Sequence, residues 1–141
     1  MNPKILVPVD GSTTSEKTIK AIIDQKERFP NKVSLLHVVD VQLAYRMIPD
    51  FQLEMVRENA RKAGQVLLDK QAKVFHAAGF ETELLLELGS PRHEIPRVAN
   101  EQEFQLLVIG RHAGTGEIRD VLFGSVANYV LHNVECPVLL F

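Results

Sequence analysis

The stretch "KILVPVDGSTTS", Lys4 to Ser15, decides the fold because it changes from one structural pattern to another within a few residues. Its first half, "KILVPV", is a short apolar run rich in branched side chains, which is typical of a strand buried on both faces. The turn residues "DGSTTS" follow at once, and Ser12, Thr13 or Thr14 is a suitable N-cap for a helix. The stretch therefore predicts a buried strand that leads through a tight turn into a helix.

The same alternation continues to the end of the chain. Apolar runs of strand length recur, and each is followed by a segment with helical periodicity. Predicted strands cover 4–9, 33–41, 81–89, 104–110 and 136–141, and predicted helices cover 15–29, about 49–78, 90–102 and 125–133. Strands that alternate with helices pair in parallel, because the crossover helices cover the faces of the sheet. We expect one doubly wound α/β domain over residues 1–141, with a five-stranded parallel sheet in the order 3-2-1-4-5 and helices on both faces.

The longest predicted helix runs from about Pro49 to Ala78, and Gly79 follows it as a C-cap residue. Its apolar side chains are expected to face the sheet. The candidates for this inward stripe are Met55, Ala63, Val66, Leu67, Ala72 and Val74.

Composition and charge narrow the possible functions. The 141 residues are 45% hydrophobic and 24% charged, which is ordinary for a folded domain, and a net charge of −2 argues against binding to nucleic acid or anionic lipid. No apolar run approaches the ~20 residues that cross a bilayer. Because Cys136 is the only cysteine and no apolar signal sequence precedes the first strand, we expect a cytoplasmic protein without a membrane or nucleic-acid partner.

The glycine-rich stretch "IGRHAGTGEIRDVLFGSV", Ile109 to Val126, falls at the carboxyl end of the fourth predicted strand. In doubly wound sheets, ligands bind at this edge. Glycines let a backbone approach a ligand closely, and Gly124 and Ser125 precede a predicted helix whose free amide groups attract phosphate. Glycines also form turns and caps where no ligand binds, so the stretch alone leaves two interpretations: an anion-binding loop or a connection between two elements.

Other residues that carry chemistry give weaker signals. Asp10, after the first predicted strand, is either a ligand contact or a helix cap, and a phosphoryl acceptor is excluded because no lysine follows the fifth strand. The four residues His76, His93, His132 and Cys136 lack the spacing of metal ligands. The chain has no Gly-x-x-x-x-Gly-Lys loop, no Gly-x-Gly-x-x-Gly after the first strand and no nucleophile elbow, which argues against fast catalysis.

In its motifs the chain resembles the universal stress protein family, small α/β domains of which one branch binds ATP. The matching stretches are "ILVPVDGS", "LLHVVD", "LLVIG" before the glycine loop and "GSVANYVLHNVECPVLLF" at the end. The ATP-binding branch carries two glycines separated by two residues, then nine residues, then Gly-Ser or Gly-Thr. Here Gly114, nine residues, Gly124 and Ser125 match, whereas three residues instead of two separate Gly110 from Gly114.

The resemblance implies a role for each matching position. The residues implied to bind the nucleotide are Pro8, Val9, Asp10, Val39, Gly110, Arg111, His112, Gly114, Gly124, Ser125, Val126 and Ala127. The first four serve adenine and ribose, with the backbone of Val39 facing the base, and Gly110 lies against the ribose. The residues from Gly114 onward offer amides to the phosphates, and the Ser125 hydroxyl reaches the magnesium ion through them. Arg111 and His112 add positive charge in the widened gap.

The function implied by the resemblance is that of a cytoplasmic ATP-binding sensor or regulator in a stress response. It would use magnesium, have an unknown regulatory protein partner and hydrolyse ATP slowly at most. The widened glycine gap favours an alternative, a dimeric interaction module of the same fold that binds no nucleotide. In both cases the apolar terminal strand Pro137 to Phe141 invites pairing with a second copy, as is common in the family, and predicts a homodimer.

Overall fold

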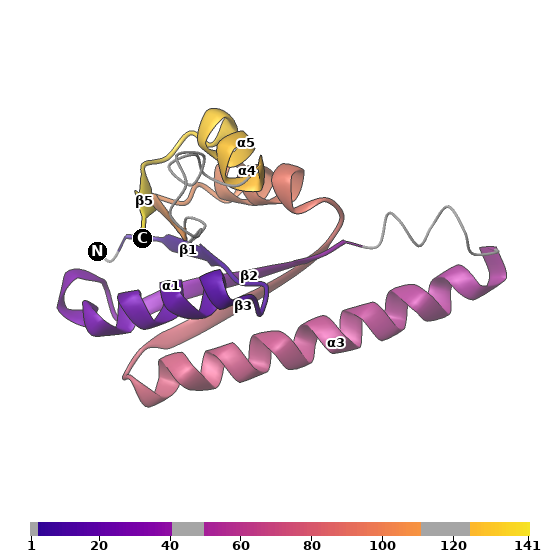
Figure 1. Ribbon diagram of the computed structural model, residues 1–141, viewed down its shortest axis with the longest axis horizontal. Helices are drawn as coiled ribbons and strands as arrows, with labels where there is room; N and C mark the ends of the chain where they lie inside the picture. Colours follow the sequence, from indigo (N-terminus) through magenta and orange to yellow (C-terminus); the bar gives the residue numbers. More distant parts are fainter. Residues whose placement is uncertain (1–2, 41–49, 111–124) are drawn as a thin grey trace.

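The computed structural model describes residues 3–40, 50–110 and 125–141. Its strands are β1 (Ile5–Pro8), β2 (Lys32–Val39), β3 (Glu81–Leu88), β4 (Leu106–Ile109) and β5 (Val138–Leu140). The helices are α1 (Thr13–Asp24), the short 3-10 helix η1 (Lys26–Arg28), α3 (Asp50–Ala77), α4 (Pro91–Glu101) and α5 (Ser125–Asn133). All strand pairs are parallel, and the sheet has the order β3-β2-β1-β4-β5 (Figure 1). The predicted fold class and strand order are confirmed.

Two layers of helix cover the sheet, one on each face. Helices α1 and α3 pack on one face through residues such as Ile22 and Phe75, and α4 and α5 pack on the other through Val98 and Val130. The side chains of β1 pack alternately against the two helix layers, because successive side chains of a strand point to opposite faces of the sheet. This burial on both faces explains why the strands are apolar runs without a polar face.

The winding of the sheet reverses at β1. This strand lies between β2 and β4, and Leu6 is in register with Ser34 on one side and with Leu107 on the other. The next two strands along the chain, β2 and β3, lie on one side of β1, and the last two, β4 and β5, lie on the other side. The carboxyl ends of β1 and β4 therefore form the place where an open α/β sheet leaves a crevice for a ligand.

Local signals set the ends of the helices. Ser12 caps α1, because its Oγ accepts a hydrogen bond from the backbone N–H of Ser15 at 3.1 Å. Gly79 follows α3 with a φ of +93°, a left-handed conformation that favours glycine, and its N–H donates to the carbonyl of His76. The predicted helix over 15–29 begins two residues earlier than expected and ends at Asp24, where η1 takes over.

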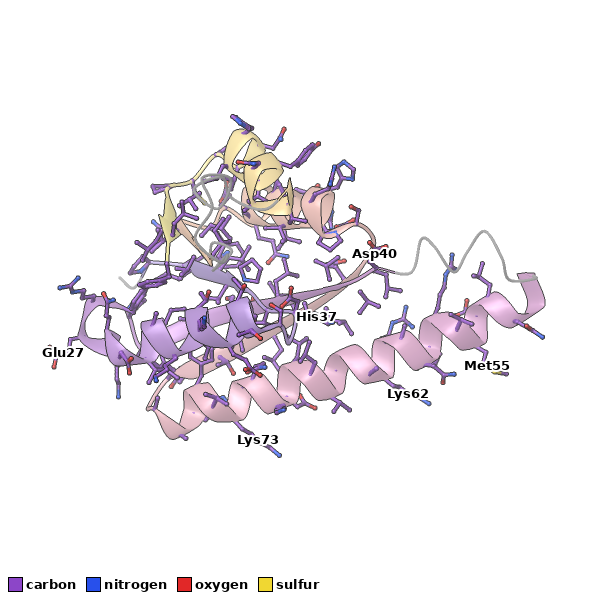
Figure 2. All side chains as sticks on the ribbon, viewed as in Figure 1. Glu27, His37, Asp40, Met55, Lys62 and Lys73 are labelled. Atoms are coloured by element: carbon purple, nitrogen blue, oxygen red, sulfur yellow. The ribbon has the colours of Figure 1, made fainter. Side chains whose placement is uncertain are left out.

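The predicted inward stripe of α3 is wrong at four of its six positions. Ala72 is buried and Leu67 is half-buried, whereas Met55, Val66 and Val74 are exposed by 66%, 68% and 42%, and Ala63 is exposed as well. Figure 2 shows Met55 on the side of α3 that faces away from the sheet. The buried face is formed instead by Gly64, Leu68, Gln71, Ala72 and Phe75.

The geometry of α3 explains the error. Its 28 residues span about 42 Å, whereas the eight residues of β3 span about 26 Å, so its first half extends beyond the sheet (Figure 1). Among the side chains of α3 that the structure describes, the buried ones all lie in the second half, where a glycine and a glutamine occupy positions on the face toward the sheet. Within the described ranges, no helix is long and apolar enough to cross a bilayer.

Candidate functional site

A cavity of about 370 Å³ opens at the carboxyl ends of β1 and β4. It lies at the point where the winding reverses, and residues of α1, α4 and α5 close it from the sides. Its walls are formed by Pro8, Val9, Asp10, Ser12, Thr14, Ser15, Thr18, Leu36, Val38, Pro91, Ile95, Ile109, Gly110, Val126, Ala127 and Val130. A volume of a few hundred Å³ is typical of a small-molecule site.

The walls differ in chemical character from one side to the other. Leu36 and Val38 of β2 and Ile95 of α4 form an apolar side, which suits a flat and weakly polar ring. The first turns of α1 bring hydroxyl groups to the opposite side, from Thr14 and Ser15 among others. The cavity can therefore hold a ligand with an apolar ring system at one end and hydroxyl or charged groups at the other.

The loop after β1 is held by hydrogen bonds within the loop. One carboxylate oxygen of Asp10 accepts from the N–H of Ser12 at 2.9 Å, and the N–H of Asp10 donates to the Oγ of Ser15 at 3.3 Å. Gly11 completes the turn with a φ of +77°, where a side chain would be strained. Asp10 thus both stabilises the start of α1 and lines the cavity, and a carboxylate oxygen at this place can accept hydrogen bonds from a ligand with hydroxyl groups.

Gly110, which the resemblance implies to lie against the ribose, follows β4 and lines the cavity. A β-carbon at this position would overlap with the hydroxyl of Thr18 and would lie 2.8 Å from the methyl carbon of Thr14. The close approach of α1 to the end of β4 therefore explains why position 110 lacks a side chain, with or without a ligand.

Val39 lies at the end of β2 but is not among the described residues that line the cavity. Its carbonyl oxygen accepts a hydrogen bond from the N–H of Gly89 at 3.0 Å. Its side chain faces α3, since one of its methyl carbons lies 2.9 Å from the position of a β-carbon on Gly64. Val38 and Leu36, on the other face of the strand, reach the cavity instead.

The phosphate side implied by the resemblance is only partly described. Val126 and Ala127 line the cavity from the first turn of α5, which begins at Ser125. Arg111, His112, Gly114, Gly124 and the side chain of Ser125 lie outside the described residues. The described part of the expected site therefore consists of Pro8, Val9, Asp10, Gly110, Val126 and Ala127 around one cavity, whereas Val39 is not part of the cavity wall.

Two helices contribute wall residues that the sequence motifs did not predict. Thr14, Ser15 and Thr18 reach the cavity from α1, and Pro91 and Ile95 reach it from α4. The signal for the first group was present, because hydroxyl residues at helical spacing directly after a strand are unusual for a core-facing helix. Nothing in the local sequence of α4 indicates that its first turns border the same cavity.

No group of three histidine, cysteine, aspartate or glutamate side chains arranged to hold a metal ion occurs within the described ranges. Around the cavity, Asp10 contributes the carboxylate and α1 contributes hydroxyl groups. These oxygen donors fit a hard cation such as magnesium only as a supplement to ligand phosphates, which is how magnesium is usually held with nucleotides.

The fold and the cavity define a doubly wound α/β protein with a cavity of small-molecule size at the switch point of its sheet. The universal stress protein family model matches residues 1–141, and the chain belongs to this family. Universal stress protein MJ0531 of Methanocaldococcus jannaschii is 32% identical over 137 residues, which are 97% of this chain and 80% of that protein.

Solved structures show the same fold. The structure of MJ0577, also from Methanocaldococcus jannaschii, has a TM-score of 0.77 and 28% identity, and the match covers 99% of this chain and 95% of that chain. The universal stress protein from Archaeoglobus fulgidus, solved in complex with dAMP, has a TM-score of 0.62 and 22% identity over 98% of this chain and 96% of that chain.

Proposed function

We propose that this protein binds an adenine nucleotide, ATP with magnesium, in the cavity at the ends of β1 and β4. The observation that carries the proposal is the cavity itself, which is apolar on one side, hydroxyl-lined on the other and placed at the switch point of the sheet. The dAMP complex of a protein with the same fold supports a ligand of this class. We further propose that binding serves a regulatory role in a cytoplasmic stress response.

The character of the walls suggests an orientation for the nucleotide. Adenine fits between Leu36, Val38 and Ile95, where it would be shielded from water. The ribose hydroxyls fit beside the carboxylate of Asp10, which accepts hydrogen bonds. The phosphates would then extend toward the amino end of α5, where backbone amides have no partner within the helix.

Phosphate binding at the amino end of α5 would give a role to each of the other residues that the resemblance implies. The amides of Val126 and Ala127 lie in the first turn of α5 at the cavity wall. Gly114, Gly124 and the Ser125 hydroxyl would complete the phosphate site, and magnesium would be held by Ser125 through the phosphates. Arg111 and His112 would add positive charge. Hydrolysis would be slow at most, because the sequence has neither a Gly-x-x-x-x-Gly-Lys loop nor a nucleophile elbow.

Two observations favour the second candidate function, a dimeric interaction module without a nucleotide. Gly110 and Gly114 are separated by three residues, and the glycine at 110 is explained by its packing against α1. The proposal of nucleotide binding therefore rests on the cavity and not on the glycine spacing.

The test is a titration of the protein with Mg-ATP by calorimetry, alongside two alanine-to-leucine variants. Ala127→Leu adds bulk at the cavity wall, whereas Ala63→Leu adds the same bulk to an exposed position of α3. We expect saturable binding in the micromolar range, weakened about tenfold or more by Ala127→Leu and unchanged by Ala63→Leu. If the wild-type protein does not bind, the interaction module is the better interpretation.

We also propose a homodimer through the C-terminal strand. Strand β5 is at the edge of the sheet, and Leu139 at its centre is 36% exposed. An apolar edge strand offers unpaired backbone groups to a second copy, and a two-fold axis satisfies both. Leu139→Lys should convert the dimer to a monomer in analytical ultracentrifugation, whereas Val66→Lys on α3 should not. A monomeric wild-type mass at micromolar concentration contradicts this proposal.

A further inference from the structure

The peptide group between Val9 and Asp10 is held from both ends. Its carbonyl oxygen, on Val9, accepts a hydrogen bond from Nδ1 of His37 at 2.8 Å, and its N–H, on Asp10, donates to the Oγ of Ser15 at 3.3 Å. Because a peptide group is planar, these two bonds together fix its orientation. Since a carbonyl oxygen can only accept, Nδ1 is the donor in this hydrogen bond.

The hydrogen bond from His37 lies just beyond the end of the regular strand. Strand β1 ends at Pro8, and the N–H of Val9 still donates to the carbonyl of Leu36 at 2.8 Å. The next partner comes from a side chain, His37, which is the neighbour of Leu36 on β2. Val9 is only 4% exposed, so water would not readily replace the hydrogen bond to its carbonyl if the His37 side chain were removed.

The imidazole reaches this carbonyl because α3 leaves room for it. Figure 2 shows His37 on β2, on the side of the sheet along which α3 runs. A β-carbon on Gly64 of α3 would lie 3.1 Å from Cδ2 of His37 and 2.9 Å from carbon atoms of both Val39 and Leu86. One turn further, a methyl carbon of Leu67 lies 3.1 Å from the position of a β-carbon on Gly11. Helix α3 thus packs directly against the residues that hold the loop after β1.

We propose that His37 is a positioning residue for the nucleotide site. It sets the plane of the Val9–Asp10 peptide and thereby the place of Asp10 at the cavity wall, from the opposite face of β2 and without contact with the ligand. The inference rests on the proposed function, because it concerns the affinity of that cavity. It adds a residue that does not line the cavity and a physical connection between the cavity and α3.

Substitutions of His37 test whether the place of its hydrogen-bond donor matters, and not only the presence of a polar side chain. The amide nitrogen of asparagine takes approximately the place of Nδ1, whereas that of glutamine reaches approximately as far as Nε2. His37→Asn therefore keeps a donor for Val9, and His37→Gln misplaces it. His76→Gln is the matched control, because Nε2 of His76 is 2.8 Å from the hydroxyl of Thr82 where α3 meets the start of β3, at the opposite edge of the sheet. His37→Phe removes the donor altogether.

The measurement is the affinity for Mg-ATP of each variant, with its urea unfolding curve as a check of folding. We expect about tenfold weaker binding for His37→Gln and His37→Phe, and binding within about threefold of wild type for His37→Asn and His76→Gln. Equal affinities for His37→Gln, His37→Asn and wild type would overturn the inference, even if unfolding midpoints differ, because His37 would then have a structural role only.

A failure of the proposed function gives a different result. If wild-type protein does not bind Mg-ATP, the backbone amide resonances of Asp10, Gly11 and Ser12 in NMR spectra test the positioning role directly. Shifts of these amides in His37→Gln that are absent in His37→Asn and His76→Gln would support it, and unchanged amides would overturn it.

Discussion

Thr18 of α1 occupies with its hydroxyl group the space that a β-carbon on Gly110 would need. Gly110→Ala should therefore push α1 away from the end of β4 and lower the free energy of unfolding by about 1–3 kcal/mol. In a Thr18→Ala background the same substitution should cost less, because the hydroxyl is gone. Urea unfolding of the four proteins of this cycle measures the coupling. Additive costs would contradict the packing explanation for this glycine.

The two helices that follow β1 and β3 offer a matched test of capping. Ser12 accepts from the N–H of Ser15, whereas Ser90, the N-cap of α4, makes no such side-chain bond. Ser12→Ala should lower the free energy of unfolding by about 1 kcal/mol, whereas Ser12→Asp should retain most of the stabilisation from the cap. Ser90→Ala should cost less than Ser12→Ala. Thermal or urea unfolding checks the order. Equal costs for the two alanine variants would show that the hydroxyl bond of Ser12 is not the cause.

Arg97 on α4 connects three carboxylates. Nε of its guanidinium donates to Glu94 at 2.6 Å, and the terminal nitrogens lie 2.9 Å from Glu101 and 3.3 Å from Glu87 on β3. The hydrogen bond with Glu94 is the main reason that the pKa of Arg97 is raised. Because its side chain is 40% exposed, water screens these pairs. Arg97→Met should lower stability by about 1 kcal/mol at low salt, and by less at high salt.

The control for Arg97 is Arg61→Met on α3. Arg61 forms an exposed ion pair with Glu58 at 2.9 Å, so its removal should change stability by less than about 0.5 kcal/mol. Equal effects of the two substitutions, or an effect of Arg97→Met that grows with salt, would contradict the role of this cluster in joining α4 to β3.

The thiol of Cys136 should react slowly. Burial raises its pKa above the ordinary value, and only the thiolate reacts with iodoacetamide. The raised pKa lowers the thiolate fraction at mildly alkaline pH, so the midpoint of the pH-rate profile should lie at higher pH than in the urea-unfolded chain. A midpoint at or below that of the unfolded chain would contradict this prediction.

Much of the fold could be predicted because the relevant signals are local. The apolar runs, the Ser-Pro pair at Ser90 and the glycine at 79 indicate where strands and helices begin and end, and strict alternation of strands and helices forces parallel pairing. The orientation of α3 could not be predicted in this way. Its buried face includes Gly64 and Gln71, which no hydrophobic pattern selects. Position 64 needs a small residue because α3 packs closely on His37 and Leu86 there.

The candidate site, like the fold, has features that the sequence predicts and features that depend on packing. The sequence alone determined where a ligand site is expected, because in a doubly wound sheet the carboxyl ends of β1 and β4 meet at the switch point, and the cavity lies there. Only the tertiary structure decided that Val38 instead of Val39 faces the cavity, that α1 and α4 complete its walls, and that His37 holds the Val9–Asp10 peptide. The reason is physical: strand ends follow from the order of elements along the chain, whereas the contacts between elements depend on which face of each strand and helix the packing turns inward.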